Sequence, residues 1–400
     1  MGTLHAALEI GTTRTVLALA ESETGKRLRV LCHAEIPSTG VRKSQILNIP
    51  DATQSIRSVL REIEKKQDAI GCKVTIHNAF LSVSGQHILA TPAFGQALVE
   101  GKRVGLNETQ EAARTARQMP IPKNRELLDI VDQDYVLDDR GGLLDPKGMS
   151  GNILKLNTLQ IHADAHRIQD ARSAAEAAHL EISEPVFATT CAADAVLEDH
   201  ERKNGVLVLD LGGGSTGYAI YTGGFLTATG VIGVGGDHIT NDIASAFQTT
   251  NAQAELLKVN EASAEPKDAS PDNARVHIGG SSSLMENRTI SRRALDTVVN
   301  VRARETFAII REILEEQGLL AHLHAGCVLT GGGASLQGID ALAEHELFLS
   351  TRRGRPIHVD GFENAKDPWS FAAIAGTLLY ADRNEENSSI LEGIFGRFFK

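Results

Sequence analysis

The stretch NGVLVLDLGGGSTGYAIYTGG, from Asn204 to Gly224, decides the fold. Its apolar residues 206–211 predict a buried strand, and residues 218–221 predict a second strand that returns beside the first. The turn between them consists of Gly212, Gly213, Gly214, Ser215 and Thr216. Because glycine loses the most backbone entropy on folding, three in a row favour a turn that must approach a ligand closely; a flexible hairpin tip is the alternative. A carboxylate beside such a turn, here Asp210, suits a magnesium ion that keeps much of its water shell.

Two further glycine turns stand elsewhere in the chain. HAALEIGTTRTVLALAE, from His5 to Glu21, predicts a hairpin whose tip, residues 11–13, offers N–H groups and hydroxyls to a phosphate within reach of Arg14. An ordinary hairpin tip remains the alternative there. HAGCVLTGGGASLQGID, from His324 to Asp340, predicts a strand, a glycine turn and a helix, which together accept a flat or anionic ligand. No GxxxxGK(S/T) occurs and no GxGxxG opens the chain, so a P-loop or Rossmann site is unsupported.

The order of these turns predicts the architecture. The first two tips lie about 200 residues apart, and two similar phosphate hairpins predict two similar α/β half-domains that close on one nucleotide. At this point the chain resembles the actin-like ATPase superfamily, which includes actin, DnaK-type chaperones and sugar kinases. The resemblance implies a two-lobed actin-like fold with ATP and Mg²⁺ as cofactors.

The resemblance narrows to the FtsA family of bacterial cell division proteins. The stretches LEIGTTRT (8–15), LSVSGQHI (81–88), DLGGGSTGYAIYTGG (210–224), GGDHITNDIASAF (235–247) and VLTGGGASLQGI (328–339) follow the order of that family, with an apolar tail behind them. They cover essentially the whole chain.

The resemblance implies a set of nucleotide-binding residues. They are Gly11, Thr12, Thr13 and Arg14 in a first phosphate loop, residues 212–216 in a second, Gly236, and Gly331, Gly332 and Gly333 in an adenosine loop. It further implies that Asp210 and Glu9 hold magnesium through water. Glu255 and Lys258, one helical turn apart, would hold the adenosine ribose; a solvated ion pair is the alternative.

Three positions bear on hydrolysis. Glu9 stands where most actin relatives carry Asp, in agreement with the FtsA family, and Gly217 stands where related sequences often carry Asp. The loss of that carboxylate predicts ATP binding with slow or absent turnover. Glu184 aligns loosely with a water-activating Glu of some actin relatives, and the alternative is a charge at a helix start beside Pro185.

Partner surfaces are implied by the resemblance. The inserted subdomain, about 83–163, would contact the next protomer of a filament and other division proteins, although a small packing lobe is the alternative. It contains a predicted helix at 107–119 and a predicted strand at 152–163. The lobe at about 240–315, with a predicted amphipathic helix at 291–317, would receive the C-terminal peptide of FtsZ, with Arg302 in that surface. Asn300 and Val301 depart from the Glu-Pro that is usual there.

Composition excludes several classes of function. The 400 residues carry a net charge of −11, which argues against general nucleic-acid binding. The four cysteines are far apart and show no metal-site spacing, which favours reduced thiols in a cytosolic protein. We find no secretory signal and no apolar run long enough to span a bilayer.

The predicted domain boundaries follow from these motifs. The first half-domain would comprise residues 1–82 and 164–204, and the second would comprise 205–380. A polar linker at 381–389 would lead to an amphipathic helix at 390–400.

The tail ENSSILEGIFGRFFK predicts a membrane anchor. On a helical wheel its apolar residues fall on one half of the circumference and the polar residues on the other. The residues predicted to face the membrane are Ile390, Leu391, Ile394, Phe395, Phe398 and Phe399, with Arg397 and Lys400 near anionic headgroups. A helix docked on the protein's own core is the alternative. One such tail should bind weakly, so a filament carrying many tails would bind by avidity.

Together these features predict an ATP-binding, polymerising protein that anchors FtsZ filaments to the cytoplasmic face of the cell membrane at the division site. Two alternatives remain: an actin-like protein of type IV pilus platforms, and a phosphotransferase of the sugar-kinase type. The first needs no lipid-binding tail. The second needs a catalytic base in the cleft, for which Asp194 and Asp237 remain weak candidates.

Overall fold

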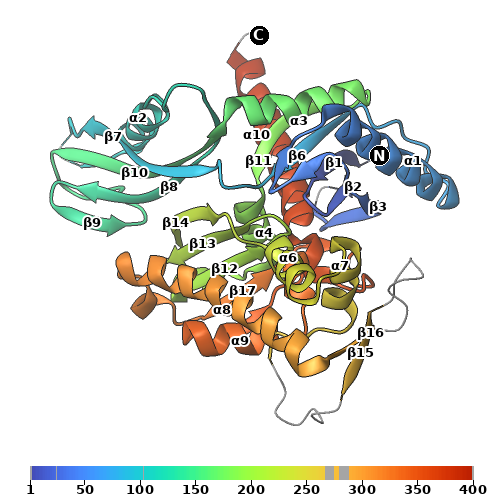
Figure 1. Ribbon diagram of the computed structural model, residues 1–400. Helices are drawn as coiled ribbons and strands as arrows, with labels where there is room; N and C mark the ends of the chain where they lie inside the picture. The colour runs from blue at the N-terminus through green and yellow to red at the C-terminus, as the bar shows by residue number, and fades with distance from the viewer. Residues whose placement is uncertain (1, 24, 102, 266–273, 279–287, 399–400) are drawn as a thin grey trace.

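The computed structural model describes residues 2–23, 25–101, 103–265, 274–278 and 288–398, and from residue 386 onward it describes the backbone alone. Two large sheets lie one above the other, and a smaller lobe extends to one side of the upper sheet (Figure 1). The prediction of a two-lobed α/β fold with an inserted subdomain is confirmed.

The first half is built on a six-stranded sheet with the order β11-β6-β1-β2-β3-β19. Its strands are β1 (Thr3–Ile10), β2 (Arg14–Ser22), β3 (Leu28–Pro37), β6 (Asn78–Val83), β11 (Glu181–Phe187) and β19 (Val359–Asp360). β1 pairs antiparallel with β2 and parallel with β6. All side chains of β2 from Val16 to Ala20 are buried, and since successive side chains point to opposite faces, both faces of this sheet are covered.

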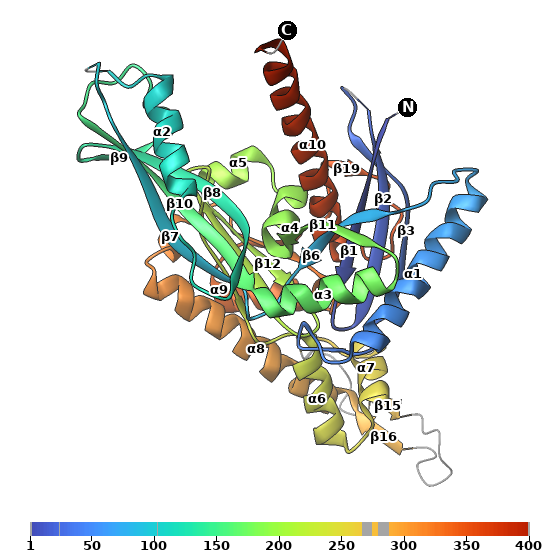
Figure 2. The same cartoon turned by 90° about the horizontal axis from the view of Figure 1, so that it is seen from above.

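Four helices lie on or beside this sheet. They are α1 (Ile49–Ala69), α3 (Ala165–Ala177), α4 (Ala188–Val196) and α10 (Ala372–Phe398). α1 begins where the Asn48 side chain accepts a hydrogen bond from the Asp51 N–H (3.2 Å) and Pro50 stands in the first turn. α1 packs against α3, whereas α10 packs against α4 and β1 (Figure 2).

The second half is built on a five-stranded sheet with the order β14-β13-β12-β17-β18. Its strands are β12 (Val206–Leu211), β13 (Thr216–Thr222), β14 (Phe225–Ile232), β17 (Cys327–Thr330) and β18 (Thr351–Arg353). β12 pairs antiparallel with β13 and parallel with β17, which repeats the pairing of β1 with β2 and β6. Both predicted phosphate hairpins are therefore present, and they hold equivalent places in the two sheets.

Helices and short elements complete the second half. The α-helices are α5 (Asp199–Asn204), α6 (Gly236–Phe247), α7 (Asn251–Asn260), α8 (Arg292–Glu316) and α9 (Ile339–Leu347). The 3-10 helices are η1 (Leu320–His322), η2 (Gly332–Ser335) and η3 (Pro368–Phe371), and the strands β15 (Arg275–Ile278) and β16 (Arg288–Ser291) form a separate ribbon. The predicted helix at 291–317 is confirmed as α8. The predicted strand and glycine turn at 327–333 are confirmed, but the turn leads first into η2 rather than directly into an α-helix.

Along the chain, the inserted lobe comes between β6 and α3. Its sheet has the order β7-β10-β8-β9, with β7 (Leu89–Leu98), β8 (Arg125–Leu137), β9 (Arg140–Leu143) and β10 (Ile153–Asp164), and α2 (Leu106–Arg117) packs on β7 and β10. Ala112 of α2 shares a small core with Leu137, Leu154 and Leu156. The helix predicted at 107–119 and the strand predicted at 152–163 are confirmed as α2 and β10.

The end of the chain differs from the predicted boundaries. β19 pairs with β3, and α10 packs on β1, so the chain returns to the first half well before residue 380. The predicted linker at 381–389 is helical and belongs to α10, which runs without a break to Phe398. A polar stretch such as ADRNEENSS can continue a helix whose first turns are already fixed by packing. The predicted membrane-facing side chains from Ile390 onward lie outside the described side chains.

α10 is held against α4 by an unusually close approach of their backbones. A Cβ atom added at Gly376 would overlap the carbonyl oxygen of Cys191. Thr377 and Leu378 beside it are fully buried. Only glycine fits at this crossing, because the backbone atoms of Cys191 cannot move away as the end of a flexible side chain can.

We therefore expect Gly376→Ala to lower the free energy of unfolding by about 1–3 kcal/mol, the usual cost of overpacking. Chemical denaturation followed by far-UV circular dichroism measures it. Gly101→Ala is the matched control, because a Cβ there meets nothing within 4 Å. Equal stability of the two variants would contradict the close crossing.

Candidate functional site

Two hairpin tips, one from each half, meet at the centre of the molecule. In the first tip the Gly11 N–H donates to the Arg14 carbonyl (2.9 Å), and in the second the Gly212 N–H donates to the Ser215 carbonyl (3.0 Å). An equivalent hydrogen bond, from residue i to residue i+3, therefore closes both turns. The tips abut so closely that a Cβ at Gly213 would lie 2.7 Å from Cγ2 of Thr13. This contact explains why the sequence places glycine there.

A small cavity of about 60 Å³, which we call the phosphate cavity, lies between these tips. It is lined by Glu9, Gly11, Thr12, Thr13, Arg14, Ser44, Ser84, Asp210, Gly212, Gly213, Ser215, Gly217, Gly331, Gly332, Ser370 and Ala373. Backbone N–H groups of glycine turns and side-chain hydroxyls are the groups that bind phosphate oxygens in proteins.

Two carboxylates line this cavity, Glu9 from β1 and Asp210 from β12. Burial raises the pKa of Glu9, against the opposing effect of the Arg14 guanidinium. Burial and, after it, the nearby negative charge of Glu9 raise the pKa of Asp210 to about 7, against the opposing effect of Arg14. Gly331, at φ +79°, passes so close that a Cβ there would lie 2.5 Å from Asp210 Oδ1. Two acidic groups removed from water in this way favour a bound cation.

Arg14 is less available to a phosphate than the sequence predicted. Its guanidinium donates to Glu35 Oε2 (2.5 Å) and to Ser370 Oγ (3.2 Å), and it lies 5.0 Å from the centre of the Phe371 ring. It lines the phosphate cavity, but its main partners come from β3 and η3. The structure therefore gives Arg14 a second role, which is to fasten η3 to the first half.

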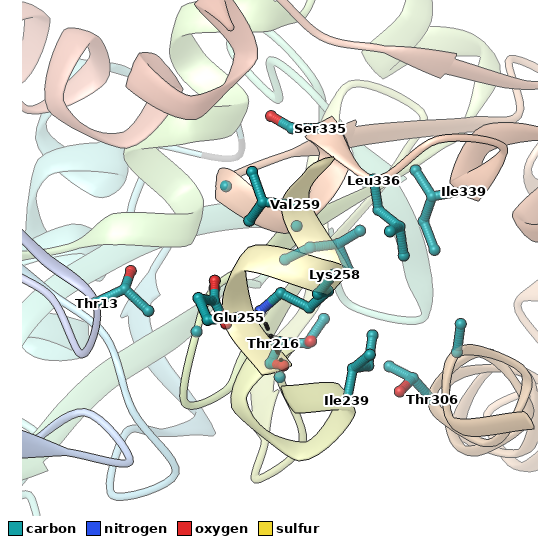
Figure 3. Close-up of a pocket in the computed structure, with 18 of the residues that line it drawn as sticks. Thr13, Thr216, Ile239, Glu255, Lys258, Val259, Thr306, Ser335, Leu336 and Ile339 are labelled. Carbon is teal, nitrogen blue, oxygen red and sulfur yellow. Dashed lines mark hydrogen bonds and ion pairs between the residues drawn. The ribbon is translucent and has the colours of Figure 1, made fainter. Parts of the chain in front are cut away.

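A larger cavity of about 200 Å³, which we call the adenosine cavity, adjoins the first and shares Thr13, Gly212, Gly213 and Gly332 with it. Its walls are largely apolar and include Phe307 of α8. Ile239 of α6, Leu336 after η2 and Ile339 at the start of α9 also contribute (Figure 3). Such a cavity suits a flat heterocycle, which needs apolar walls and a few polar anchors.

Glu255 and Lys258 supply polar groups at the edge of the adenosine cavity (Figure 3). Lys258 Nζ lies 2.7 Å from Glu255 Oε2 and donates to Thr240 Oγ1 (2.9 Å) and to the Gly236 carbonyl (3.2 Å). The i,i+3 ion pair considered from the sequence is therefore present. Both side chains line the cavity, and the Lys258 side chain is 12% exposed whereas that of Glu255 is 39% exposed.

The N-terminus of α6 is docked on the second phosphate loop. The N–H groups of Gly236 and Asp237 donate to the carbonyls of Gly212 (3.0 Å) and Gly213 (2.8 Å). A Cβ at Gly235 would lie 2.6 Å from the Gly213 carbonyl oxygen. Glycine at 235 thus allows helix and loop to form one unit.

The predicted residues mostly come together in these two cavities. Gly214 is the exception among the predicted nucleotide-binding residues, because it lines neither cavity and lies under residues 43 and 44 instead. Sequence reasoning missed the polar residues Ser44, Ser84, Thr306, Ser335 and Ser370 and the apolar wall of the adenosine cavity. Ser84 and Ser335 lie inside two of the quoted motifs, whereas Ser44, Thr306 and Ser370 come from segments that no motif marks.

Glu184 lies elsewhere. Its carboxylate accepts hydrogen bonds from the Tyr380 hydroxyl (3.0 Å) and the Asn384 amide (2.8 Å), both on α10, and it lines neither cavity. The prediction that Glu184 activates water is therefore not supported, and the alternative of a helix start is also wrong because residue 184 lies within β11. Its role here is to hold α10.

Arg302 lies on α8, away from both cavities. It donates to Asp242 of α6 (2.6 Å and 3.2 Å) and pairs with Glu305. Its side chain is 25% exposed, while the neighbouring Val301 is 61% exposed. Arg302 thus ties α6 to α8 at the surface of the second half.

The described part of the chain contains no helix long and apolar enough to span a membrane. It also contains no group of three or more His, Cys, Asp or Glu side chains arranged to hold a metal ion.

Comparisons with known proteins identify the family. The family model described as "Cell division protein FtsA" matches residues 207–376, and that described as "SHS2 domain inserted in FTSA" matches residues 85–162. The cell division protein FtsA of Pseudomonas aeruginosa is 31% identical over 380 residues, which cover 95% of this chain and 89% of that protein. The chain belongs to the FtsA family. FtsA of Bacillus subtilis is 28% identical, with 95% of this chain and 84% of that protein covered.

Solved structures show the fold. A PilM–PilN type IV pilus biogenesis complex has a TM-score of 0.65 at 18% identity, covering 94% of this chain and 98% of that chain. MreB5 of Spiroplasma citri bound to ADP has a TM-score of 0.53 at 14% identity, covering 96% and 98%. At these identities the likeness concerns the actin-like fold alone. The pilus-platform alternative is thus weaker than the FtsA assignment, and cell division is the role of this protein.

Gly217 lies in tight contact with α4. A Cβ at this position would overlap Oγ1 of Thr189 and lie 3.0 Å from Thr189 Cβ. Thr189 stands at the start of α4, is fully buried, and its hydroxyl has no hydrogen-bond partner among the described residues. The space that a residue-217 side chain would take is therefore filled by Thr189.

We expect Gly217→Ala to lower the free energy of unfolding by about 1–3 kcal/mol through this overlap. In the double variant Gly217→Ala with Thr189→Ala, much of that loss should be recovered, because the overlapping hydroxyl is gone. Urea denaturation of both single variants and the double variant forms a double-mutant cycle. Strictly additive effects would show that the two positions do not compete for space.

Proposed function

We propose that this FtsA-family protein binds ATP with Mg²⁺, polymerises, and tethers FtsZ filaments to the cytoplasmic face of the cell membrane at the division site. The observation that carries the nucleotide proposal is the junction of the two cavities. An apolar chamber and a glycine- and hydroxyl-lined chamber share four residues, so a nucleotide would place its base in the first and its phosphates in the second.

The donor set fits magnesium. Magnesium is usually held by one or two carboxylates together with phosphates and several waters, rather than by a cage of protein ligands. Asp210 and Glu9 provide that number of carboxylates, and burial raises the pKa of both in the absence of a cation. When bound, the ion would neutralise charge between these carboxylates and the phosphates. Glu184 is not part of this proposal, and no hydrolytic base is assigned.

Each chamber would act on a different part of the nucleotide. The N–H groups and hydroxyls of the residues 11–13 and 212–216 would hold phosphates, and Glu255 with Lys258 would face the ribose. Apolar contacts with Phe307 and Leu336 would hold the base.

We expect ATP with Mg²⁺ to raise the unfolding temperature of the full chain. At 100 times the dissociation constant, binding adds about 2.7 kcal/mol to stability. Asp210→Asn should lose at least about tenfold in ATP affinity with Mg²⁺ present and much less in EDTA, since the lost charge acts through the ion. Fluorescence titration with a labelled ATP measures both.

Asp139→Asn, an exposed carboxylate in the inserted lobe, is the matched control for this titration. Unchanged ATP affinity in Asp210→Asn, or no thermal shift with any adenine nucleotide, would contradict the nucleotide proposal.

The membrane and FtsZ parts of the proposal rest on two other regions. The amphipathic sequence from Ile390 to Lys400 would lie in the interface with its phenylalanines toward the lipid, and α10 gives it a helical base. The surface of α8 that carries Arg302 would receive the FtsZ peptide. The inserted lobe, proposed as residues 83–163, would contact the next protomer and other division proteins. Because one tail binds weakly, assembly into filaments would strengthen membrane binding.

We expect FtsZ to co-sediment with anionic liposomes only in the presence of the full chain and ATP. A chain ending at Ser389 should leave FtsZ in the supernatant. That truncation keeps Tyr380 and Asn384, which hold α10 to Glu184, so the fold should persist. Full recruitment of FtsZ by the truncated chain would contradict the tether.

A charge swap separates two roles of Arg302 in the same assay. Arg302→Asp combined with Asp242→Arg restores the ion pair between α8 and α6 with reversed ends. If Arg302 binds the FtsZ peptide, the swapped chain should still bind liposomes but fail to recruit FtsZ. Normal recruitment of FtsZ by the swapped chain would show that Arg302 serves only its ion pair with Asp242.

A further inference from the structure

A short hairpin that no sequence motif marks lies beside the phosphate cavity. β4 (Val41–Arg42) and β5 (Gln45–Ile46) pair only with each other and join no larger sheet. The two residues of their turn, Lys43 and Ser44, have φ angles of +49° and +57°. Two-residue turns with positive φ at both positions strongly prefer Asn-Gly, because other side chains are strained there. Such strain persists where the side chains are needed.

The turn contacts both phosphate loops. The Ser44 N–H donates to Thr12 Oγ1 (2.8 Å) in the first loop, and Ser44 Oγ lies 3.1 Å from Ser215 Oγ in the second. Gly214 lies directly beneath it, since a Cβ there would be 2.6 Å from the Lys43 Cα. Ser44 therefore links the two halves of the molecule through one residue.

The position of Ser44 along the site indicates which phosphate it would meet. The phosphate cavity joins the adenosine cavity through Thr13, Gly212, Gly213 and Gly332, and Ser44 is not among those shared residues. Ser44 and Ser84 instead separate the phosphate cavity from a further chamber of about 170 Å³. A triphosphate that enters from the adenosine side would thus bring its last phosphate toward Ser44.

The positively charged side chains at the site are already bound to other residues, so a phosphate there would need a further cation. Arg14 is bound to Glu35 and Ser370, and Lys258 is paired with Glu255. Lys43 is exposed and forms no ion pair with any residue that the structure describes. A flexible lysine beside a phosphate site can turn toward the anion at little cost, since it breaks no existing contact.

We propose that the Lys43–Ser44 turn is a third phosphate-binding element, which recognises the terminal phosphate of a nucleoside triphosphate. The Ser44 hydroxyl donates to a terminal phosphate oxygen, and the Lys43 ammonium neutralises its charge from the solvent side. Because Ser44 also touches both loops, the terminal phosphate strengthens the contact between the halves. This inference rests on the nucleotide binding proposed above.

The test uses the full chain and compares its affinities for ATP and ADP, each with Mg²⁺, by isothermal titration calorimetry. The decisive variant is Lys43→Asn with Ser44→Gly, which supplies the preferred turn residues and removes both functional groups. We expect its ATP affinity to fall about tenfold or more relative to its ADP affinity, as the loss of charge-assisted hydrogen bonds implies. Its unfolding temperature should stay the same or rise, since the turn is relieved of strain.

The single variants and a control complete the design. Lys43→Ala and Ser44→Ala should each lose part of the preference for ATP over ADP. Lys147→Ala, an exposed lysine in the inserted lobe, should keep the wild-type preference and controls for net charge.

The outcomes separate this inference from the function on which it rests. If the unaltered chain binds neither nucleotide, nucleotide binding itself is wrong, and the inference falls with it. If the unaltered chain binds both nucleotides and the Lys43→Asn, Ser44→Gly variant keeps the same ratio of affinities, the turn has only a structural role and the inference alone is overturned. An equal loss for ATP and ADP in that variant would also overturn it, because it would place the turn beside an inner phosphate.

Discussion

Two half-buried carboxylates, Glu9 from the first half and Asp210 from the second, line one cavity, and the rest of the site is arranged around their negative charge. Each stands on the first strand of its hairpin, and both line the phosphate cavity. Burial raises the pKa of both groups, and the negative charge of Glu9 adds to the rise at Asp210. The glycine turns around them supply N–H groups rather than cations. A ligand that brings positive charge and phosphate oxygens together would complete this arrangement.

α10 connects that cavity to the far end of the chain. Ala373, in the first turn of α10, lines the phosphate cavity. The 27 residues of α10 give the helix a length of about 40 Å. Gly376 lets it approach α4, and Glu184 binds it through Tyr380 and Asn384. A continuous helix transmits displacement better than a flexible linker. In the proposed function, the wall of the nucleotide site and the membrane anchor therefore belong to one element.

The sequence predicted the hairpins and their glycine tips because these features are local: apolar runs, a turn and the next run lie within twenty residues of one another. The family resemblance placed Gly11, Gly212 and Gly331 in one site, and all three line the phosphate cavity, although Gly331 was expected in the adenosine loop and does not line the adenosine cavity. It did not predict Ser44, Phe307 or Ser370, since these residues lie in segments whose composition is ordinary. It misplaced Glu184, because position along a strand does not reveal which neighbouring helix a side chain faces.

By itself, then, the sequence determined the repeated hairpins, the inserted lobe and the family, since periodicity and motif order are properties of the chain alone. Only the tertiary structure decided that the chain returns to the first half at β19, that residues 381–389 continue α10, and that Thr189 fills the space beside Gly217. The physical reason is the same in each case. Close packing is settled between segments far apart in the chain, where a single atom can decide what fits, and no local pattern records it.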